Sequence, residues 1–164
     1  MMKRALLTTL LLLAAASAPA EDEPQWLGAG ELDLAKYEGQ VVLVDFWASW
    51  CKPCKESMPW LSAMQEKYGA QGLRIVAVNI DKKLDSALAM GDLLHEDLVL
   101  VHDPKGKLAG EYELQGMPSS YLYDRRGELA ASHVGFLAAE CDNREAELAK
   151  LIGSAEAEGH DDSE

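Results

Sequence analysis

The chain has few cysteines and no arrangement of them that would hold a metal ion. Of its three cysteines, Cys51 and Cys54 are only three positions apart. A structural zinc site needs about four ligands, and no second Cys pair or His pair stands at ligand spacing. A structural disulfide framework usually uses an even number of cysteines and joins distant segments. A single short-range pair therefore indicates redox chemistry, with a purely structural disulfide as the alternative.

Basic residues are scarce, which limits the kinds of partner. The chain has 15 Lys and Arg against 28 Asp and Glu, a formal net charge of −13. Such a surface repels nucleic acid and anionic lipid and attracts basic partners. Part of the excess acid lies in residues 153–164, GSAEAEGHDDSE, which hold no large apolar side chain. We expect this segment to be a disordered acidic tail.

No apolar run reaches the roughly 20 residues that a bilayer-spanning helix needs. The longest, Ala5 to Ala16, follows Lys3 and Arg4 and precedes the small residues Ala18-Pro19-Ala20. This order predicts a signal peptide over residues 1–20, cleaved on export to the periplasm. The alternative is an uncleaved membrane anchor. No Cys stands at the cleavage point, which argues against a lipoprotein.

No internal repeat or linker divides the remainder, so residues 21–152 are expected to form one domain. Apolar runs predict strands over residues 41–47, 73–80, 98–101, 120–123 and 128–134. Helical spacing and glycine stops predict a turn over residues 34–37 and helices over 52–68, 83–95, 107–114 and 138–152. The order of these elements predicts an α/β fold with a mixed central β-sheet flanked by helices.

The spacing around the cysteine pair predicts a different chemical role for each sulfur. A buried strand ends at Trp47, a short turn follows, and a helix begins near Lys52. Cys51 then lies at a helix N-terminus, where free backbone N–H groups and the helix dipole favour a thiolate. Lys52 adds a positive charge. Cys54 lies one turn further in, so Cys51 is predicted to attack a partner and Cys54 to resolve the mixed disulfide.

The segment Val-Asp-Phe-Trp-Ala-Ser-Trp-Cys-Lys-Pro-Cys, residues 44–54, resembles the active site of thioredoxin. Its Trp-Ala-Ser-Trp form is most similar to the exported TlpA/ResA type of thiol–disulfide oxidoreductase, which is linked to cytochrome c maturation. The similarity runs over residues 31–152. Pro59, five residues after Cys54, matches the family's helix proline. The resemblance implies a thioredoxin-like fold with no cofactor beyond the Cys51–Cys54 disulfide.

The same resemblance implies a substrate groove. Met117-Pro118 matches the family's cis-proline, where the preceding residue pairs its backbone with the bound chain. An ordinary trans bond is the alternative. With Trp50, Lys52 and Pro53 around the cysteines, Met117 and Pro118 are the candidate substrate-binding residues.

Asp45 is the third candidate catalytic residue. A carboxylate among Val, Leu and Phe is costly to bury in its charged form, so its pKa should be raised. In thioredoxin, an aspartate at the matching position accepts the proton of the second cysteine; the alternative is an Asp45 that faces solvent. Thioredoxin commonly has a Lys partner on the next strand, where this chain has Val76 and Val78.

These residues predict a reductant of disulfides in exported proteins that is re-reduced by a membrane thiol donor such as a transmembrane reductase. The resemblance alone implies apocytochrome c as a substrate. An oxidant or isomerase and a non-catalytic metal- or partner-binding module are the alternatives. A copper carrier would want three residues between the cysteines, and no peroxide pocket of Cys with Thr and Arg is recognisable. We expect a monomer that binds no nucleic acid, with Cys141 a spare, half-buried thiol.

Overall fold

The computed structural model describes residues 26–154, so the leader expected at 1–20 and the tail beyond Ser154 lie outside the described residues. One six-stranded sheet organises the fold, with the strand order β1-β4-β3-β2-β5-β6. The first four strands of this order are parallel, and β5 and β6 run antiparallel to their neighbours. The strands are β1 (Trp26–Gly28), β2 (Val41–Trp47), β3 (Leu73–Asn79), β4 (Val99–His102), β5 (Ser119–Tyr123) and β6 (Leu129–Val134).

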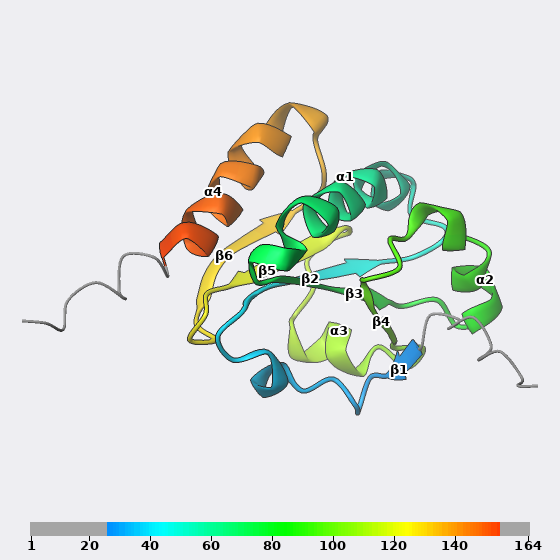
Figure 1. The fold of residues 1–164 in the computed structure, drawn as a ribbon. Helices are drawn as coiled ribbons and strands as arrows, with labels where there is room; N and C mark the ends of the chain where they lie inside the picture. Colours follow the sequence, from blue (N-terminus) through cyan, green and yellow to red (C-terminus); the bar gives the residue numbers. More distant parts are fainter. Residues whose placement is uncertain (1–25, 155–164) are drawn as a thin grey trace, which may run out of the picture.

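Helices cover both faces of this sheet (Figure 1). The α-helices are α1 (Lys52–Tyr68), α2 (Leu84–Leu88), α3 (Lys107–Glu111) and α4 (Cys141–Gly153). Short 3-10 turns are η1 (Leu34–Tyr37), η2 (Gly69–Gln71), η3 (Gly91–Leu93) and η4 (Ala138–Glu140). Helices α1 and α4 pack on one face, and α3 and η1 pack on the other. The predicted α/β fold with a mixed, helix-flanked sheet is confirmed.

Strand β2 lies at the centre, and all seven of its residues are buried. Successive side chains of a strand point to opposite faces. Val41, Leu43 and Trp47 accordingly join the core under α1 and α4. The residues between them, Val42, Val44 and Phe46, join the core under α3. This alternation places Asp45 on the face that α1 and α4 cover.

Helix α1 has the predicted bounds because its end signals are local. Cys51 is its N-cap, Pro53 lies in the first turn, and Gly69 follows the last helical residue. A proline costs no hydrogen bond in a first turn, where the N–H groups have no helical partner. Pro59 inside the helix does remove one backbone donor. One face of α1, which includes Cys54, Met58 and Leu61, is buried against the sheet.

Three elements differ from the prediction. Strand β1 is not among the predicted strands, and it forms because Trp26 to Gly28 pair with β4, a non-local contact. The helix expected over 83–95 is limited to α2 and η3. Gly91 weakens helical continuation there, and Ser62 Oγ donates to Leu93 O and accepts from His95 N.

Helix α3 also ends earlier than expected, at Glu111. The backbone of Glu113 has a φ of 49°, in the left-handed region that ends a right-handed helix. The other predicted strands and the last helix differ from the observed bounds by a few residues only.

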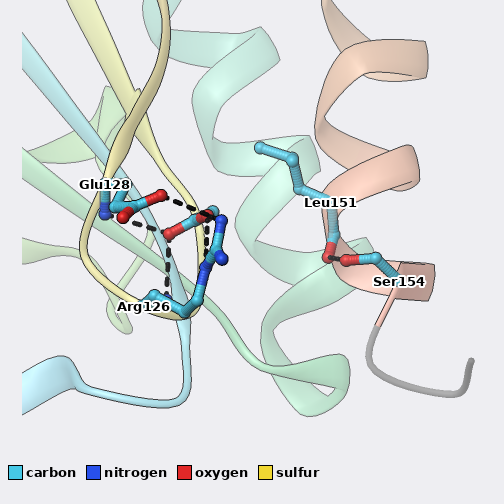
Figure 2. A network of polar contacts seen from close by, with 5 residues as sticks. Arg126, Glu128, Leu151 and Ser154 are labelled. Carbon is cyan, nitrogen blue, oxygen red and sulfur yellow. Dashed lines mark hydrogen bonds and ion pairs between the residues drawn. The ribbon is translucent and has the colours of Figure 1, made fainter. Parts of the chain in front are cut away.

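The turn that joins the antiparallel strands β5 and β6 lies near the end of α4 (Figure 2). Arg126 Nη2 is 3.1 Å from Asp124 Oδ2 and 2.8 Å from Glu128 Oε2. At the end of α4, Ser154 Oγ donates to Leu151 O over 2.7 Å. None of the helices within residues 26–154 is long and apolar enough to span a bilayer.

Candidate active site

The two cysteines form a disulfide at the start of α1, with 5.3 Å between their Cα atoms. Cys51 caps the helix, and its Sγ accepts a hydrogen bond of 3.3 Å from Cys54 N. Only 6% of Cys51 is exposed, and Cys54 is fully buried. The predicted asymmetry is present: the first sulfur lies at the surface edge of the helix end, and the second lies behind it. The Cys54 N–H, at the N-terminus of the helix, is directed at Cys51 Sγ and favours negative charge on that atom.

A buried carboxylate holds the turn that carries Cys51. Asp81 Oδ2 accepts from Ser49 N over 2.9 Å, and Asp81 Oδ1 accepts from Ser49 Oγ over 3.0 Å. Asn79 Nδ2 donates to the same carboxylate, and a ring nitrogen of His102 lies 2.8 Å from Asp81 O. Sequence reasoning missed this network. The signal was available: Asn79 and Asp81 are polar residues directly after an apolar strand.

An open groove runs beside Cys51. Trp50, at 68% exposure, is part of its lining. Met117 also lines the groove, and the Met117–Pro118 peptide bond is cis, as predicted. The residues that line the groove are Trp50, Cys51, Pro53, Ile80, Ala109, Gly110, Leu114, Gln115, Gly116 and Met117. This arrangement suits an extended segment of a partner chain.

Two of the predicted substrate-binding residues are not part of this lining. Lys52 is highly exposed and pairs with Glu56 on the next turn of α1, with 3.8 Å between Nζ and Oε1. Pro118 is buried below the groove. The structure therefore brings Trp50, Pro53 and Met117 together around Cys51.

Asp45 is buried in the sheet below α1, the helix that carries Cys54. Its Oδ2 accepts a hydrogen bond of 3.0 Å from Ser120 Oγ, and its Oδ1 has no partner among residues 26–154. Burial raises the pKa of Asp45 from 3.8 to about 7, against the opposing effects of the Ser120 hydrogen bond and the Arg144 charge. The predicted raised pKa is confirmed, and an Asp45 that faces solvent is wrong.

The polar surroundings of Asp45 differ from the expectation. Val76 and Val78, expected at the place of a Lys partner, belong to the opposite core under α3. The β3 residue in register with Asp45 is Ala77. Its hydrogen bond comes from Ser120 on β5, and its nearby positive charge comes from Arg144 on α4. Strand pairing and helix packing set these neighbours, so local sequence could not reveal them.

The remaining candidate ligands do not gather into a metal site. Within residues 26–154, no group of three or more His, Cys, Asp or Glu side chains is placed to hold a metal ion. Cys141 is free and half-buried, as predicted, and burial raises the pKa of its thiol.

Comparison with known proteins places the chain in a family. Residues 15–132 match the AhpC/TSA family. The chain belongs to the AhpC/TSA family. Among curated proteins, thioredoxin-like protein YneN of Bacillus subtilis is 33% identical over 112 residues, which cover 66% of this chain and 65% of that protein. Thiol-disulfide oxidoreductase ResA of Geobacillus kaustophilus is 29% identical over 117 residues, 71% and 67% of the two chains. The chain thus spans about two thirds of the length of these relatives.

Solved structures agree with the thioredoxin-like fold. A protein of Chlorobium tepidum named as thiol:disulfide interchange protein DsbE shares 40% identity and a TM-score of 0.69, covering 73% of this chain and 84% of that one. The exposed lipoprotein thioredoxin Etrx1 of Streptococcus pneumoniae shares 28% identity and a TM-score of 0.62, covering 72% and 90%. The resemblance to ResA-type proteins seen in residues 44–54 is confirmed.

Proposed function

We propose that this protein is a thiol–disulfide oxidoreductase that reduces disulfides in exported proteins through Cys51 and Cys54. The observation that carries the proposal is the disulfide at the N-terminus of α1, with Cys51 on an open groove and Cys54 enclosed behind it. The names of ResA and of the DsbE-type protein support the same chemistry.

The reaction transfers two electrons in two exchanges. Reduced Cys51, as a thiolate, attacks one sulfur of the substrate disulfide, and the other substrate sulfur leaves as a thiolate that takes up a proton. Cys54 then loses its proton to the Asp45 carboxylate and attacks Cys51 Sγ. The second substrate sulfur leaves, and the Cys51–Cys54 disulfide remains.

The groove has a defined part in this reaction. Trp50, Pro53 and Met117 hold the segment of substrate that flanks its disulfide, and the backbone of Met117 adds main-chain hydrogen bonds. Lys52 and Pro118 are the chain neighbours of these residues but do not line the groove. Re-reduction needs two electrons from a thiol donor, which we assign to a transmembrane reductase on the periplasmic side of the membrane.

The cellular setting follows from the leader and the relatives. A signal peptide over residues 1–20 would export the domain, and apocytochrome c haem-attachment cysteines are the proposed substrate. N-terminal sequencing of the exported protein should begin near Glu21. Trapping with Cys54→Ser should leave the substrate bound to Cys51 as a mixed disulfide, which mass spectrometry identifies.

The direct test of the activity is reduction of insulin by dithiothreitol with catalytic amounts of the protein. Wild type should accelerate the reaction, and Cys51→Ser should abolish the acceleration. Acceleration that survives Cys51→Ser would contradict the proposal. The direction of electron transfer is tested by measuring the reduction potential of the Cys51–Cys54 pair in equilibrium with glutathione. A potential well below the roughly −180 mV of protein disulfide isomerase supports a reductant, and a potential near or above it indicates an oxidant or isomerase.

A further inference from the structure

A row of polar side chains crosses the otherwise apolar sheet face below α1 and α4. Asp45 on β2 lies directly opposite Ser120 on β5, and Ser120 lies directly opposite His133 on β6. Residues directly opposite one another in antiparallel strands point to the same face, with Cβ atoms about 5 Å apart. His133 Nε2 is 2.8 Å from Glu147 Oε2 on α4, which ends the row.

Exposure increases along this row from the centre of the sheet to its edge. Asp45 and Ser120 are 1% and 5% exposed. The side chains of His133 and Glu147 are 26% and 47% exposed. The row therefore joins a buried carboxyl to solvent through groups that can pass on a proton: a hydroxyl and a neutral imidazole each accept and donate, and so does a protonated carboxyl.

A small cavity lies between Ser120 and the His133–Glu147 pair. Trp60 of α1 and Arg144 and Leu148 of α4 close it from above, and Leu43 and Leu122 line its floor. Its volume is about 10 Å³, which is room for one water molecule. Trp60 Nε1 and Arg144 Nε have no hydrogen-bond partner in the part of the chain that the structure describes. A water molecule there would accept from one of these donors and from Ser120 Oγ, and would donate its own hydrogens to Glu147 and His133.

We propose that Ser120, the cavity, His133 and Glu147 form the route by which the proton taken up by Asp45 returns to solvent. This inference rests on the proposed function, because it starts from the proton that Cys54 gives to Asp45. Protonated Asp45 donates to Ser120 Oγ, and the Ser120 hydroxyl passes its own hydrogen to the cavity. The proton then moves to the Glu147 carboxylate or the His133 ring, and from there to bulk water. One proton leaves Asp45 and one reaches solvent.

The charges around Asp45 favour this direction. Arg144 carries a positive charge on α4 that favours the ionised form of Asp45. Its own charge is balanced by Glu140, with 3.0 Å between Nη2 and Oε2. On the other packed elements, α1 places Cys54 in the core on the same sheet face, β5 contributes Ser120, and β3 contributes the apolar Ala77. Of the ionisable side chains that line the cavity, His133 and Glu147 are the partly exposed ones, and Arg144 is buried.

The test measures the resolution step at several pH values in dilute, bulky buffer. A mixed disulfide is prepared on Cys51, and its loss through Cys54 is followed by stopped-flow fluorescence. His133→Gln and Ser120→Ala should slow this step about tenfold, less than the roughly hundredfold or more expected on loss of the group that takes the proton from Cys54 directly. Ser120→Thr, which keeps the hydroxyl, should restore the rate. Added imidazole should restore the rate of His133→Gln, because it carries protons to the open end of the row.

His95→Gln is the matched control. His95 also pairs with a carboxylate, Asp97, and its side chain is exposed to a similar degree, 23% against 26% for His133. The His95→Gln protein should resolve the mixed disulfide at the wild-type rate. Glu147 lies at the surface, so Glu147→Gln should fold. It therefore tests the route even if Ser120→Ala does not fold.

The outcomes separate the route from the activity. If His133→Gln and Glu147→Gln resolve the mixed disulfide at the wild-type rate at every pH, the route is wrong. If the wild type also reduces insulin normally, the proposed function stays intact. If added imidazole does not restore the slowed resolution step of His133→Gln, His133 has a structural role and the route is also wrong. Failure of the wild type to reduce insulin would remove the proposed function itself.

Discussion

Asp45 is a carboxylic acid within a strand whose other six residues are apolar and buried. Removal of its ionised form from water costs more than its one hydrogen bond to Ser120 returns, so its pKa rises to about 7. Near neutral pH the side chain is thus divided between both protonation states. This is the condition in which a group accepts and releases a proton most readily.

A first prediction concerns catalysis by Asp45. The rate of mixed-disulfide resolution should rise as pH rises through about 7, because only the carboxylate accepts the Cys54 proton. Asp45→Asn should resolve the mixed disulfide at least about a hundredfold more slowly and lose this pH dependence. Stopped-flow measurement of the two proteins from pH 5 to about 9 is the check. An unchanged rate in Asp45→Asn would remove the base role from Asp45.

The same residue predicts how stability depends on pH. The folded protein binds the Asp45 proton more tightly than the unfolded chain does, since the pKa is about 7 when folded and 3.8 for an ordinary aspartate. The resulting stabilisation is complete below pH 3.8 and is lost as pH rises to about 7. Asp45→Asn has no such loss of stability. Its free energy of unfolding at pH 8 should exceed that of the wild type by a few kcal/mol, since each pKa unit corresponds to about 1.4 kcal/mol.

Urea unfolding of the oxidised proteins at a series of pH values measures this difference. The gap between variant and wild type should narrow as pH falls toward 4. A gap that does not change with pH would mean that the side chain affects stability through packing rather than ionisation.

At the scale of elements, the side chain of Arg125 is hydrogen-bonded to three separate segments of the chain. Arg125 donates to the carbonyl oxygens of Gly39, Gln71 and Ile152, at 2.7, 3.0 and 2.9 Å. These carbonyls belong to the loop before β2, to η2 and to the last turn of α4. A planar guanidinium reaches three acceptors at fixed angles, which an ammonium does not.

Arg125→Ala should therefore lower the free energy of unfolding by about 2 kcal/mol, and Arg125→Lys should recover only part of this loss. The neighbouring Arg126 is the matched control. It lies on the surface of the same turn in ion pairs with Asp124 and Glu128 (Figure 2), and such pairs contribute about 0–1 kcal/mol. Equal losses in Arg125→Ala and Arg126→Ala on urea unfolding would contradict this assignment.

Elements with local end signals could be predicted, and elements held by distant contacts could not. Helix α1 was located from its N-cap, its first-turn proline and its terminal glycine. Strand β1 has three residues and depends on pairing with β4, about 75 positions later in the chain. The segment 83–95 has helical spacing, yet bonds to Ser62 hold its second half in another conformation.

At the scale of the whole molecule, net charge affects which partners approach. The chain has a formal net charge of −13, while the groove beside Cys51 is lined by apolar and uncharged residues. Long-range attraction should therefore select basic partners, and the groove itself should accept apolar segments.

This predicts a salt-dependent preference among peptide disulfides. A peptide with Lys around its cysteine should be reduced with a higher kcat/KM than its Glu counterpart, by about tenfold at low ionic strength. The ratio should fall toward one as the Debye length shortens from about 30 Å to about 10 Å between 0.01 and 0.1 M salt. Kinetics of the two peptides at both salt concentrations provide the measurement. A ratio independent of salt would show that contacts within the groove, not the field of the protein, set the preference.

The sequence by itself determined the fold class, the cysteine pair that forms the disulfide, and the raised pKa of Asp45. Each of these follows from short-range features: an apolar strand, a turn, and two cysteines at the start of a helix. Only the tertiary structure decided which side chains surround them. Ser120 lies opposite Asp45 across a strand pair, and His133 lies opposite Ser120 on the next strand. The charge of Arg144 acts on Asp45 from a helix about 100 positions away, and Asp81 accepts a hydrogen bond from Ser49. The reason is physical: hydrophobic spacing specifies which residues of an element are buried, whereas strand register and helix packing decide which buried residues become neighbours.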